Sequence, residues 1–465
     1  MLTVGYLANQ FPSPVEPYVA AEVEELRRRG IRIITGSVRK QRDAAQHSAQ
    51  IGLQPLNMML LLQALWLCVC RFGRISSLMR RVLFHGKEGP IRRVKAFGHT
   101  WMGACYAVRL KGRGIDHIHV HHGYFASWIG MTAARLLNIN FSMTLHGSDL
   151  LLHRAYLDTK LTNCLFCFTI SEYNRQHILE NHPKVKPQKI VVSRLGVEVP
   201  ENHFRFFIGQ QRGPVDLTLL AVGRLHEVKD HAFLIRACAQ LQAQGVSFEC
   251  SIAGDGPERR RLGSLIRKLG LAERVTLLGH VAREQTDSLY DRADVVVLTS
   301  RSEGIPLVLM EAMARGKIVL APAITGIPEL VADRKTGFLF EAGSMEDFID
   351  RLLFIHSLFR AKSQTENPNS PRPERHHLVS SAAKHLDWVK HAARVQVSHN
   401  FHRNTNLKLF ADLFLSRIAT RSETIHENPV LQQVQLPVQR DRGLPLRVNG
   451  TNAHTGTRSS PVFHG

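Results

Sequence analysis

The sequence predicts an α/β protein built from two Rossmann-like domains that face one another. Short apolar runs rich in β-branched residues alternate with helical patterns in both halves of the chain. Polar and glycine-containing loops follow the predicted strands, and ligands bind at such loops in open parallel sheets. At 465 residues, of which 44% are hydrophobic, the chain is long enough to form two cores.

The first domain is expected over residues 1–199. Its opening strand is followed by a proline-containing loop, a helical pattern that stops at Gly30 and a second strand, which together form a βαβ unit. The strands expected in this domain span residues 2–8, 31–35, 117–121, 141–145 and 166–170. Residues 200–215 are polar and aperiodic, which predicts a linker between the domains.

The second domain is expected over residues 216–380. Its predicted strands span residues 217–222, 247–253, 275–277, 294–298 and 336–340, with helical patterns between them. Residues 360–375 are rich in Pro, Asn and Ser and are predicted to be a loop insertion. Closing helices are expected within residues 381–419. Residues 420–465 contain few apolar side chains in any period, which predicts a disordered tail.

Two carboxylates eight residues apart, Glu303 and Glu311, follow a predicted strand of the second domain. Glu303 is expected in the loop after the strand, Pro306 at the first position of the next helix, and Glu311 beyond the first turn of that helix. A helix N-terminus presents free N–H groups, which favour anions. A phosphate-bearing ligand would fit between the two glutamates, although such a pair is also typical of a solvated helix face.

The formal net charge of +21 predicts attraction to polyanions. A nucleic acid is one candidate, but the sequence contains no zinc-finger spacing, no RNP-type aromatic motif and no zipper-linked basic region. An anionic membrane surface is the other, because the apolar run Leu56–Cys70 precedes eight basic residues: Arg71, Arg74, Arg80, Arg81, Lys87, Arg92, Arg93 and Lys95. The run is shorter than the roughly 20 residues that span a bilayer. It is therefore expected either to lie in the membrane interface or to form a buried helix.

The cysteines are expected to be structural, and the clustered histidines at 117–122 are expected either to be satisfied by neighbours or to face the cleft. The seven cysteines show no framework spacing, which suits a reducing compartment, and no secretory signal is visible. Cys164 and Cys167 form one CxxC motif without a second ligand pair and are expected to be buried thiols. His119 and His121 share a strand face, but no Asp, Glu or Cys joins them at ligand spacing, so no metal site is predicted.

The block from Ser302 to Ala314, followed by Gly316 and the sequence GIPE at 326–329, resembles the E-x7-E block of retaining nucleotide-sugar glycosyltransferases of family 4. Further segments resemble motifs of this family: the His119–His121 strand, the loop at 146–149, residues 170–174 and 194–198, the Gly223-Arg224…Lys229 signature and the turn at 254–257. The proline-rich loop after the first strand is similar to that of the exopolysaccharide and colanic-acid branch.

The resemblance implies the GT-B fold, in which the last helices cross back onto the first domain. It also implies a donor site made of Gly223, Arg224, Lys229, Gly304, Ile305, Leu307, Val308 and Glu311, with Glu303, His146, Arg224 and Lys229 as catalytic residues. Arg224 and Lys229 would grip the nucleotide diphosphate. Glu303 would hold hydroxyls of the donor sugar, Glu311 would hold the ribose, and His146 would face the sugar.

Two residues depart from the family pattern. Asp230 stands where a glycine usually follows the lysine, and it is expected to cap the next helix. Pro306 stands where many relatives have glycine, so one backbone donor to the sugar is missing and the identity of the sugar stays open.

The function that the resemblance implies is that of a retaining, metal-independent hexosyltransferase. It would move a sugar from a UDP- or GDP-sugar to a hydroxyl of a glycan or lipid-linked acceptor, in bacterial exopolysaccharide or lipopolysaccharide synthesis. No cofactor is expected, because the nucleotide sugar is a substrate. The enzyme is expected in the cytoplasm, either free or peripheral on the inner face of the cell membrane. A sugar-nucleotide epimerase or phosphorylase, or a basic nucleic-acid-binding protein, are the alternatives.

Overall fold

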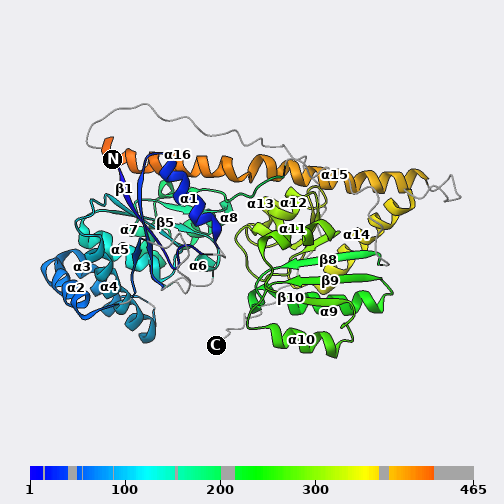
Figure 1. Cartoon of the computed structure of the whole chain (residues 1–465), viewed down its shortest axis with the longest axis horizontal. Coiled ribbons are helices and arrows are strands. Elements are labelled where there is room, and N and C mark those ends of the chain that lie inside the picture. Colours follow the sequence, from blue (N-terminus) through cyan, green and yellow to red (C-terminus); the bar gives the residue numbers. More distant parts are fainter. Residues whose placement is uncertain are drawn as a thin grey trace, which may run out of the picture. The chain divides into compact units, whose positions relative to one another are not determined.

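The structure, a computed structural model, describes residues 1–13, 16–39, 50–54, 56–86, 88–151, 155–200, 215–365 and 376–423. Within these ranges the chain forms two parallel sheets, each with helices packed on it (Figure 1). The α/β class predicted from the sequence is therefore confirmed. Nearly all of the expected linker at 200–215, residues 366–375 of the expected loop insertion and the segment from 424 to 465 lie outside the described residues.

The first sheet has seven described strands, all paired in parallel. In spatial order they are β3 (Ile51–Gly52), β2 (Arg32–Ser37), β1 (Thr3–Ala8), β4 (His117–His121), β5 (Asn140–Leu145), β6 (Cys167–Thr169) and β7 (Ile190–Val192). The helices of this region are α1 (Pro17–Arg28), α2 (Met58–Cys70), α3 (Phe72–Phe84), α4 (Pro90–Leu110), α5 (Phe125–Leu137), α6 (Ser148–Leu151), α7 (Leu157–Asn163) and α8 (Glu172–Asn181). The sequence predicted five of these strands to within a few residues of their ends.

The second sheet has six described strands, also in parallel. In spatial order they are β10 (Val275–Gly279), β9 (Phe248–Ala253), β8 (Leu217–Val222), β11 (Val295–Val297), β12 (Ile318–Pro322) and β13 (Phe338–Phe340). The helices are α9 (His231–Ala243), α10 (Arg259–Lys268), α11 (Arg283–Arg292), α12 (Leu307–Ala314), α13 (Ile327–Leu330) and α14 (Met345–Thr365). The three valines of β11 are fully buried, as expected for a central strand covered on both faces.

The two C-terminal helices, α15 (His376–Asn400) and α16 (Arg403–Glu423), belong to different cores. Ala393, Val397 and Phe401 pack with the second sheet, whereas Phe410 and Phe414 of α16 pack with side chains of β1 and β6 in the first. The expected crossing of the last helices onto the first domain is therefore confirmed.

The structure corrects one expectation near the C-terminus. Helix α14 continues to Thr365, so the first part of the predicted loop insertion at 360–375 is helical. Apolar side chains such as Leu358 and Phe359 on its buried face support this extension. Helix α16 extends to Glu423, and the rest of the tail predicted from residue 420 lies outside the described residues.

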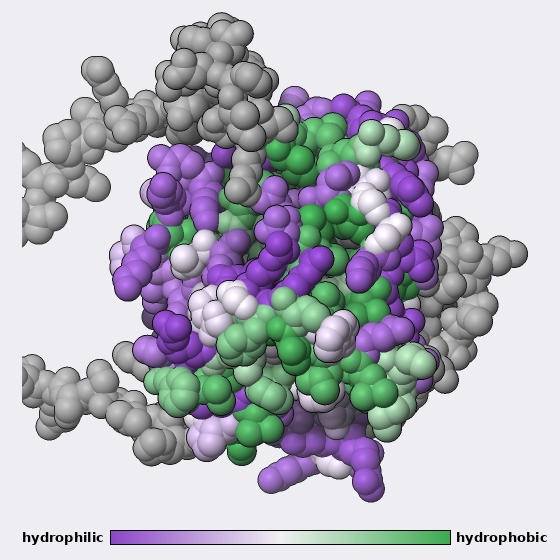
Figure 2. Space-filling view, turned by 90° about the vertical axis from the view of Figure 1, so that its left-hand side faces the viewer, coloured by the Kyte–Doolittle hydropathy of each residue, from purple (hydrophilic) through white to green (hydrophobic). Residues whose placement is uncertain are grey.

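Helix α2 shows that the apolar run at 56–70 is not a buried helix, which was one of the two alternatives. Asn57 caps the helix by accepting a hydrogen bond from the N–H of Leu60. Leu60, Ala64 and Leu67 face the core, but apolar side chains on the opposite face are exposed: Met58, Met59, Leu62, Leu65, Trp66 and Val69. Figure 2 shows hydrophobic residues gathered on this side of the molecule.

Among the described residues, no single helix has the length and apolar composition to cross a bilayer. Only α2 and α3 taken together have both, and the chain bends by 96° between them.

Candidate functional site

The centre of the candidate site is an ion pair between Lys229 and Glu303. Lys229 lies after β8 in a short 3₁₀ turn, and Glu303 lies in the loop between β11 and α12. Because β8 and β11 are parallel neighbours, both loops leave the same edge of the sheet. The Nζ atom of Lys229 lies 2.5 Å from an Oε1 atom of Glu303, and both side chains are mostly buried. The structure thus brings two of the predicted catalytic residues into contact.

Arg224 lies two residues after the end of β8 and is exposed. Its side chain has no hydrogen bond or ion pair within the ranges that the structure describes. Gly223, beside it, faces the stem of Lys229, because a Cβ atom at Gly223 would lie 3.7 Å from the Lys229 Cδ atom. Arg224 therefore lies in the same loop as Lys229, and its guanidinium is available to bind a ligand.

Helix α12 begins at Leu307, and Pro306 is its N-cap rather than its first residue, which corrects the prediction. The Pro306 carbonyl accepts hydrogen bonds from Leu309 and Met310. The preceding N–H groups of Leu307 and Val308 lie in the first turn, where the helix offers no partner. The Ile305 side chain is buried in the core of the second sheet, so only its backbone could reach a ligand.

Glu311 lies inside α12, as expected, and contacts a residue that the sequence did not single out. The hydroxyl of Tyr290, on α11, donates a hydrogen bond of 2.9 Å to a Glu311 oxygen. Burial raises the pKa of Glu311, and the hydrogen bond from Tyr290 opposes this rise. Arg315 lies over the Tyr290 ring at 5.2 Å. Tyr290 occupies an ordinary buried helix position, so nothing in the sequence pattern marks it as a site residue.

Two glycines bring the loop after β5 against the Glu303 loop. A Cβ atom at Gly304 would lie 2.4 Å from the carbonyl oxygen of His146, and one at Gly147 would lie 2.9 Å from the nitrogen of Gly304. Any side chain at either position would force the loops apart. His146, predicted to face the donor sugar, therefore lies next to Glu303 although the two residues follow strands of different sheets.

His146 is held by a buried chain of hydrogen bonds. Its Nε2 atom lies 3.0 Å from His121 Nδ1, and the Nε2 atom of His121 lies 2.6 Å from a Glu22 oxygen. Tyr6 also donates to Glu22 at 2.6 Å. Burial lowers the pKa of His146 well below its usual value, so the ring is neutral at pH 7.

The sequence contained a signal for Glu22 that the prediction missed. Val19, Glu22, Val23 and Leu26 follow the i, i+3, i+4, i+7 spacing of one helix face, and the structure buries all four. A carboxylate on the buried face of an amphipathic helix requires a polar partner.

Asp149 fixes the backbone of the His146 loop. Its carboxylate accepts hydrogen bonds from the N–H groups of Gly123, His146 and Gly147 at 2.8, 3.1 and 2.9 Å. His122 lies between Asp149 and Glu16, at 3.5 and 2.9 Å. Burial opposes the charged form of His122, but the hydrogen bonds and charges of the two carboxylates outweigh it and raise its pKa to about 10.

The other two histidines of β4 lie within hydrogen-bonding distance of buried hydroxyl groups on β5. His117 and His119 each lie within hydrogen-bonding distance of Ser142, and His119 also reaches Thr144. Cys164 and Cys167 are buried free thiols. In the part of the chain that the structure describes, no group of three or more His, Cys, Asp or Glu side chains is placed to hold a metal ion.

Two family models match the chain. The model described as "Glycosyltransferase Family 4" matches residues 15–200, and that described as "Glycosyl transferases group 1" matches residues 209–363. Together they cover the whole second sheet, all strands of the first sheet except β1, and the predicted donor-site residues.

Individual proteins are similar to this chain either over a shorter part of it or at a lower sequence identity. A putative colanic acid biosynthesis glycosyltransferase, WcaL of Salmonella typhimurium, is 39% identical over 173 residues, which is 36% of this chain and 42% of WcaL. The amylovoran biosynthesis glycosyltransferase AmsK of Erwinia amylovora is 32% identical over 38% of this chain and 51% of AmsK. The chain thus spans about half or less of these relatives. The crystal structure of Anabaena HepE with UDP and glucose has a TM-score of 0.59 at 17% identity, covering 90% of this chain and all of HepE, which shows a shared fold.

Proposed function

Since this chain belongs to family 4 of the glycosyltransferases and has the GT-B fold, we propose that it transfers a sugar from a UDP- or GDP-sugar to an acceptor hydroxyl, with retention of configuration. The observation that carries the proposal is the Lys229–Glu303 pair, which lies at the strand ends beside the first turn of α12 and against the His146 loop. A cation, a carboxylate and unpaired amides at one place suit a ligand that joins a diphosphate to a polyhydroxylated sugar.

The cations would stabilise the leaving group. As the bond between the sugar C1 atom and the diphosphate breaks, negative charge grows on the phosphate oxygens. Lys229, Arg224 and the N–H groups of Leu307 and Val308 would receive it. Donor binding would move the Lys229 ammonium from Glu303 to the diphosphate and free Glu303 to accept hydrogen bonds from sugar hydroxyls. We propose that these groups act without a metal ion.

We propose that retention results from entry of the acceptor on the face that the diphosphate leaves. The acceptor oxygen forms the new bond to C1 there, and its proton passes to the departing phosphate oxygen. The neutral His146 ring would lie over the sugar without attracting negative charge away from the cations. Closure of the site would exclude water and favour transfer over hydrolysis. No protein side chain is assigned as a nucleophile.

Glu311 and Tyr290 would bind the nucleoside. A carboxylate on the first turns of α12 can accept hydrogen bonds from both ribose hydroxyls, and Tyr290 holds it in one orientation. UDP in the solved structure of Anabaena HepE supports a uridine donor for this fold, although the two proteins share only 17% of their residues.

A panel of UDP- and GDP-sugars tests the proposal. A donor that binds only the folded protein raises the unfolding temperature with its concentration. The donor that does so is then incubated with the protein and a glycan acceptor, with and without EDTA, and nucleotide diphosphate release and the anomer of the product are measured. Absence of stabilisation by every nucleotide sugar would refute the proposal, and loss of activity in EDTA would refute its metal-free form. Turnover that needs inorganic phosphate as acceptor would indicate a phosphorylase instead.

The acceptor is proposed to be a lipid-linked glycan of exopolysaccharide synthesis, with the enzyme at the inner face of the cell membrane. The similarity to proteins of colanic acid and amylovoran synthesis supports the pathway class. The exposed apolar face of α2 supports membrane attachment (Figure 2). The protein is expected to sediment with anionic liposomes and much less with neutral ones, and Trp66→Ser should weaken this binding. Equal sedimentation with both would refute membrane attachment.

A further inference from the structure

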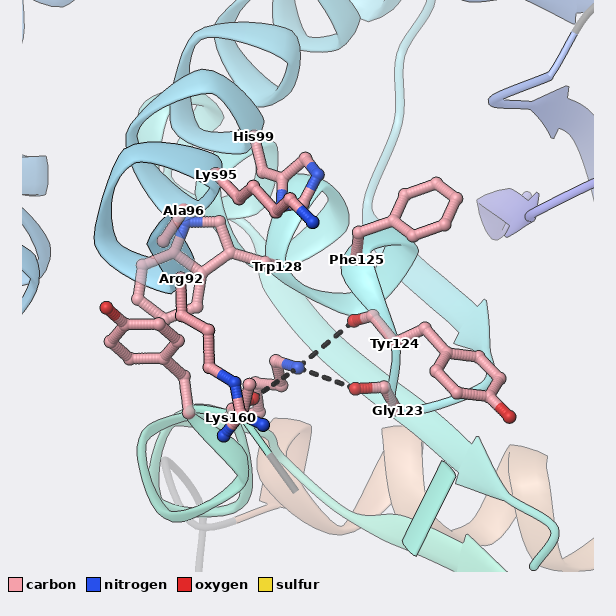
Figure 3. A pocket seen from close by; sticks show the side chains of 11 residues that line it. Arg92, Lys95, Ala96, His99, Gly123, Tyr124, Phe125, Trp128 and Lys160 are labelled. Atoms are coloured by element: carbon pink, nitrogen blue, oxygen red, sulfur yellow. Dashed lines mark hydrogen bonds between the residues drawn. The ribbon is translucent and has the colours of Figure 1, made fainter. Parts of the chain in front are cut away.

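A pocket lies in the first domain, beside the Gly123–Tyr124 segment. It has a volume of about 310 Å³ and lies between α4, the start of α5 and the start of α7. Its lining combines aromatic and cationic side chains: Arg92, Lys95, His99, Tyr124, Phe125, Trp128, Tyr156 and Lys160. Figure 3 shows Arg92 and Lys95 reaching the pocket from α4, and Lys160 entering from α7.

Two of the cations that line this pocket, Arg92 and Lys95, form no ion pair with the described carboxylates near it. Arg92 and Lys95 are exposed, and neither has a hydrogen-bond or ion-pair partner among the residues that the structure describes. The nearby carboxylates Glu88 and Asp158 are both paired with Arg81. The two cations on α4 are therefore available to an anionic ligand.

Burial lowers the pKa of both Lys160 and His99, but only that of His99 is lowered further by neighbouring cations. Lys160 is buried and donates hydrogen bonds to the carbonyl oxygens of Gly123, Tyr124 and Ala155 at 2.5, 3.0 and 3.0 Å. Burial lowers the pKa of its ammonium to about 7. Burial, together with the charges of Lys160 and Lys95, lowers the pKa of His99 to about 4. The charges of Lys160 and Lys95 that lower the pKa of His99 show that both cations act on the interior of the pocket, and an anion bound there would offset them.

The apolar face of α4 borders the pocket. Ile91, Val94, Phe97 and Trp101 are exposed and follow one helical stripe, whereas Arg92, Lys95 and His99 follow the adjacent stripe, which lines the pocket. Helix α2, with its own exposed apolar side chains, packs against α4. A ligand with an anionic head and a long apolar tail would match both stripes at once.

The pocket is connected to the candidate active site through its backbone wall. Gly123 donates its N–H to Asp149, the residue that fixes the His146 loop, while the Gly123 carbonyl accepts from Lys160 on the pocket side. A ligand bound in the pocket would therefore lie beside Gly123, whose N–H is hydrogen-bonded to the residue that fixes the His146 loop.

We propose that the pocket lined by Arg92, Lys95 and Lys160 binds the phosphate group of a lipid-linked acceptor, whose hydrocarbon chain lies along the apolar stripe of α4. This inference rests on the proposed transferase function and names the chemical class of its acceptor. It assigns Arg92 and Lys95 to phosphate binding, which is distinct from the general attraction of a basic surface to a membrane.

Calorimetric titration of the full chain with farnesyl diphosphate, below the concentration at which it forms micelles, tests the inference. Farnesyl diphosphate should bind at least tenfold more tightly than inorganic pyrophosphate, which lacks the chain, and than farnesol, which lacks the charge. Arg92→Gln and Lys95→Gln should each weaken farnesyl diphosphate binding by about tenfold, since each removes a charge-assisted contact. Both residues are exposed, so these variants should fold.

A control variant makes the outcomes distinct. Lys111→Gln removes an exposed cation just beyond α4 that does not line the pocket, and it should leave binding unchanged. Equal affinity in the Arg92 and Lys95 variants and the wild type, loss of binding in Lys111→Gln, or pyrophosphate that binds as tightly as farnesyl diphosphate would each overturn the inference.

This titration contains no nucleotide sugar, so its result is independent of the donor. A protein that binds a UDP- or GDP-sugar but not farnesyl diphosphate would refute only the acceptor inference. The converse result would refute only the proposed function.

Discussion

Replacement of Lys229 by alanine is expected to lower kcat by about 10²- to 10³-fold, which is the usual effect of losing one preorganised donor to a developing negative charge. This corresponds to roughly 3–4 kcal/mol of transition-state stabilisation, at about 1.4 kcal/mol for each factor of ten. The Lys229 ammonium lies 2.5 Å from Glu303, and its side chain is 22% exposed, so the charge is positioned before the donor binds. Measurement of nucleotide diphosphate release at saturating donor gives kcat directly.

The same substitution should destabilise the protein in a way that depends on Glu303. Lys229→Ala leaves the Glu303 carboxylate mostly buried without its cation, a loss of about 1–3 kcal/mol. Glu303→Gln in the same chain removes the unpaired charge, so the double variant should be more stable than the sum of the two single changes predicts. Chemical denaturation of the four proteins measures this coupling.

A matched lysine makes the control for both measurements. Lys362 forms an ion pair of 2.6 Å with Asp387 and is 20% exposed, but it joins α14 to α15 away from the candidate site. Lys362→Ala should cost stability and leave kcat within about threefold of the wild type. A Lys229→Ala enzyme with a kcat within that same range, or stability changes that simply add, would refute the reasoning.

Three further outcomes follow from the described contacts. The raised pKa of His122 contributes stability that is complete below the unfolded pKa of 6.5 and is lost as the pH rises towards about 10. The unfolding temperature of the wild type should therefore fall over this pH window, whereas that of His122→Gln should change less. Thermal scans at each pH would measure this difference. Tyr290→Phe removes the hydroxyl that holds Glu311 and should weaken nucleotide binding by about tenfold with little change in kcat; an unchanged dissociation constant in calorimetry would contradict the assignment. Glu329 accepts hydrogen bonds from the N–H groups of Glu172 and Tyr173 at the start of α8, so Glu329→Ala should lower the free energy of unfolding by about 1 kcal/mol in urea titration, and an equal midpoint would count against this cap.

Much of the candidate donor site could be predicted from the sequence because it is built from local patterns. A run such as Val295–Val297 predicts a buried strand, and a polar loop after such a strand lies at the edge where parallel sheets bind ligands. The position of Glu303 follows from these rules, as does the cap that Asp230 provides by accepting from the N–H of Phe233. The spacing of Arg224 and Lys229 has meaning only through the resemblance to family 4.

The sequence alone determined the α/β class, most of the strands and the loops that carry the predicted donor residues, because strand and helix patterns depend on near neighbours in the chain. Only the tertiary structure decided which distant residues meet. It placed Tyr290 on Glu311, brought the His146 loop against Gly304 and joined α4 and α7 around a cationic pocket. Such contacts depend on sheet order and on the packing of one loop against another, and no periodicity along the chain records them.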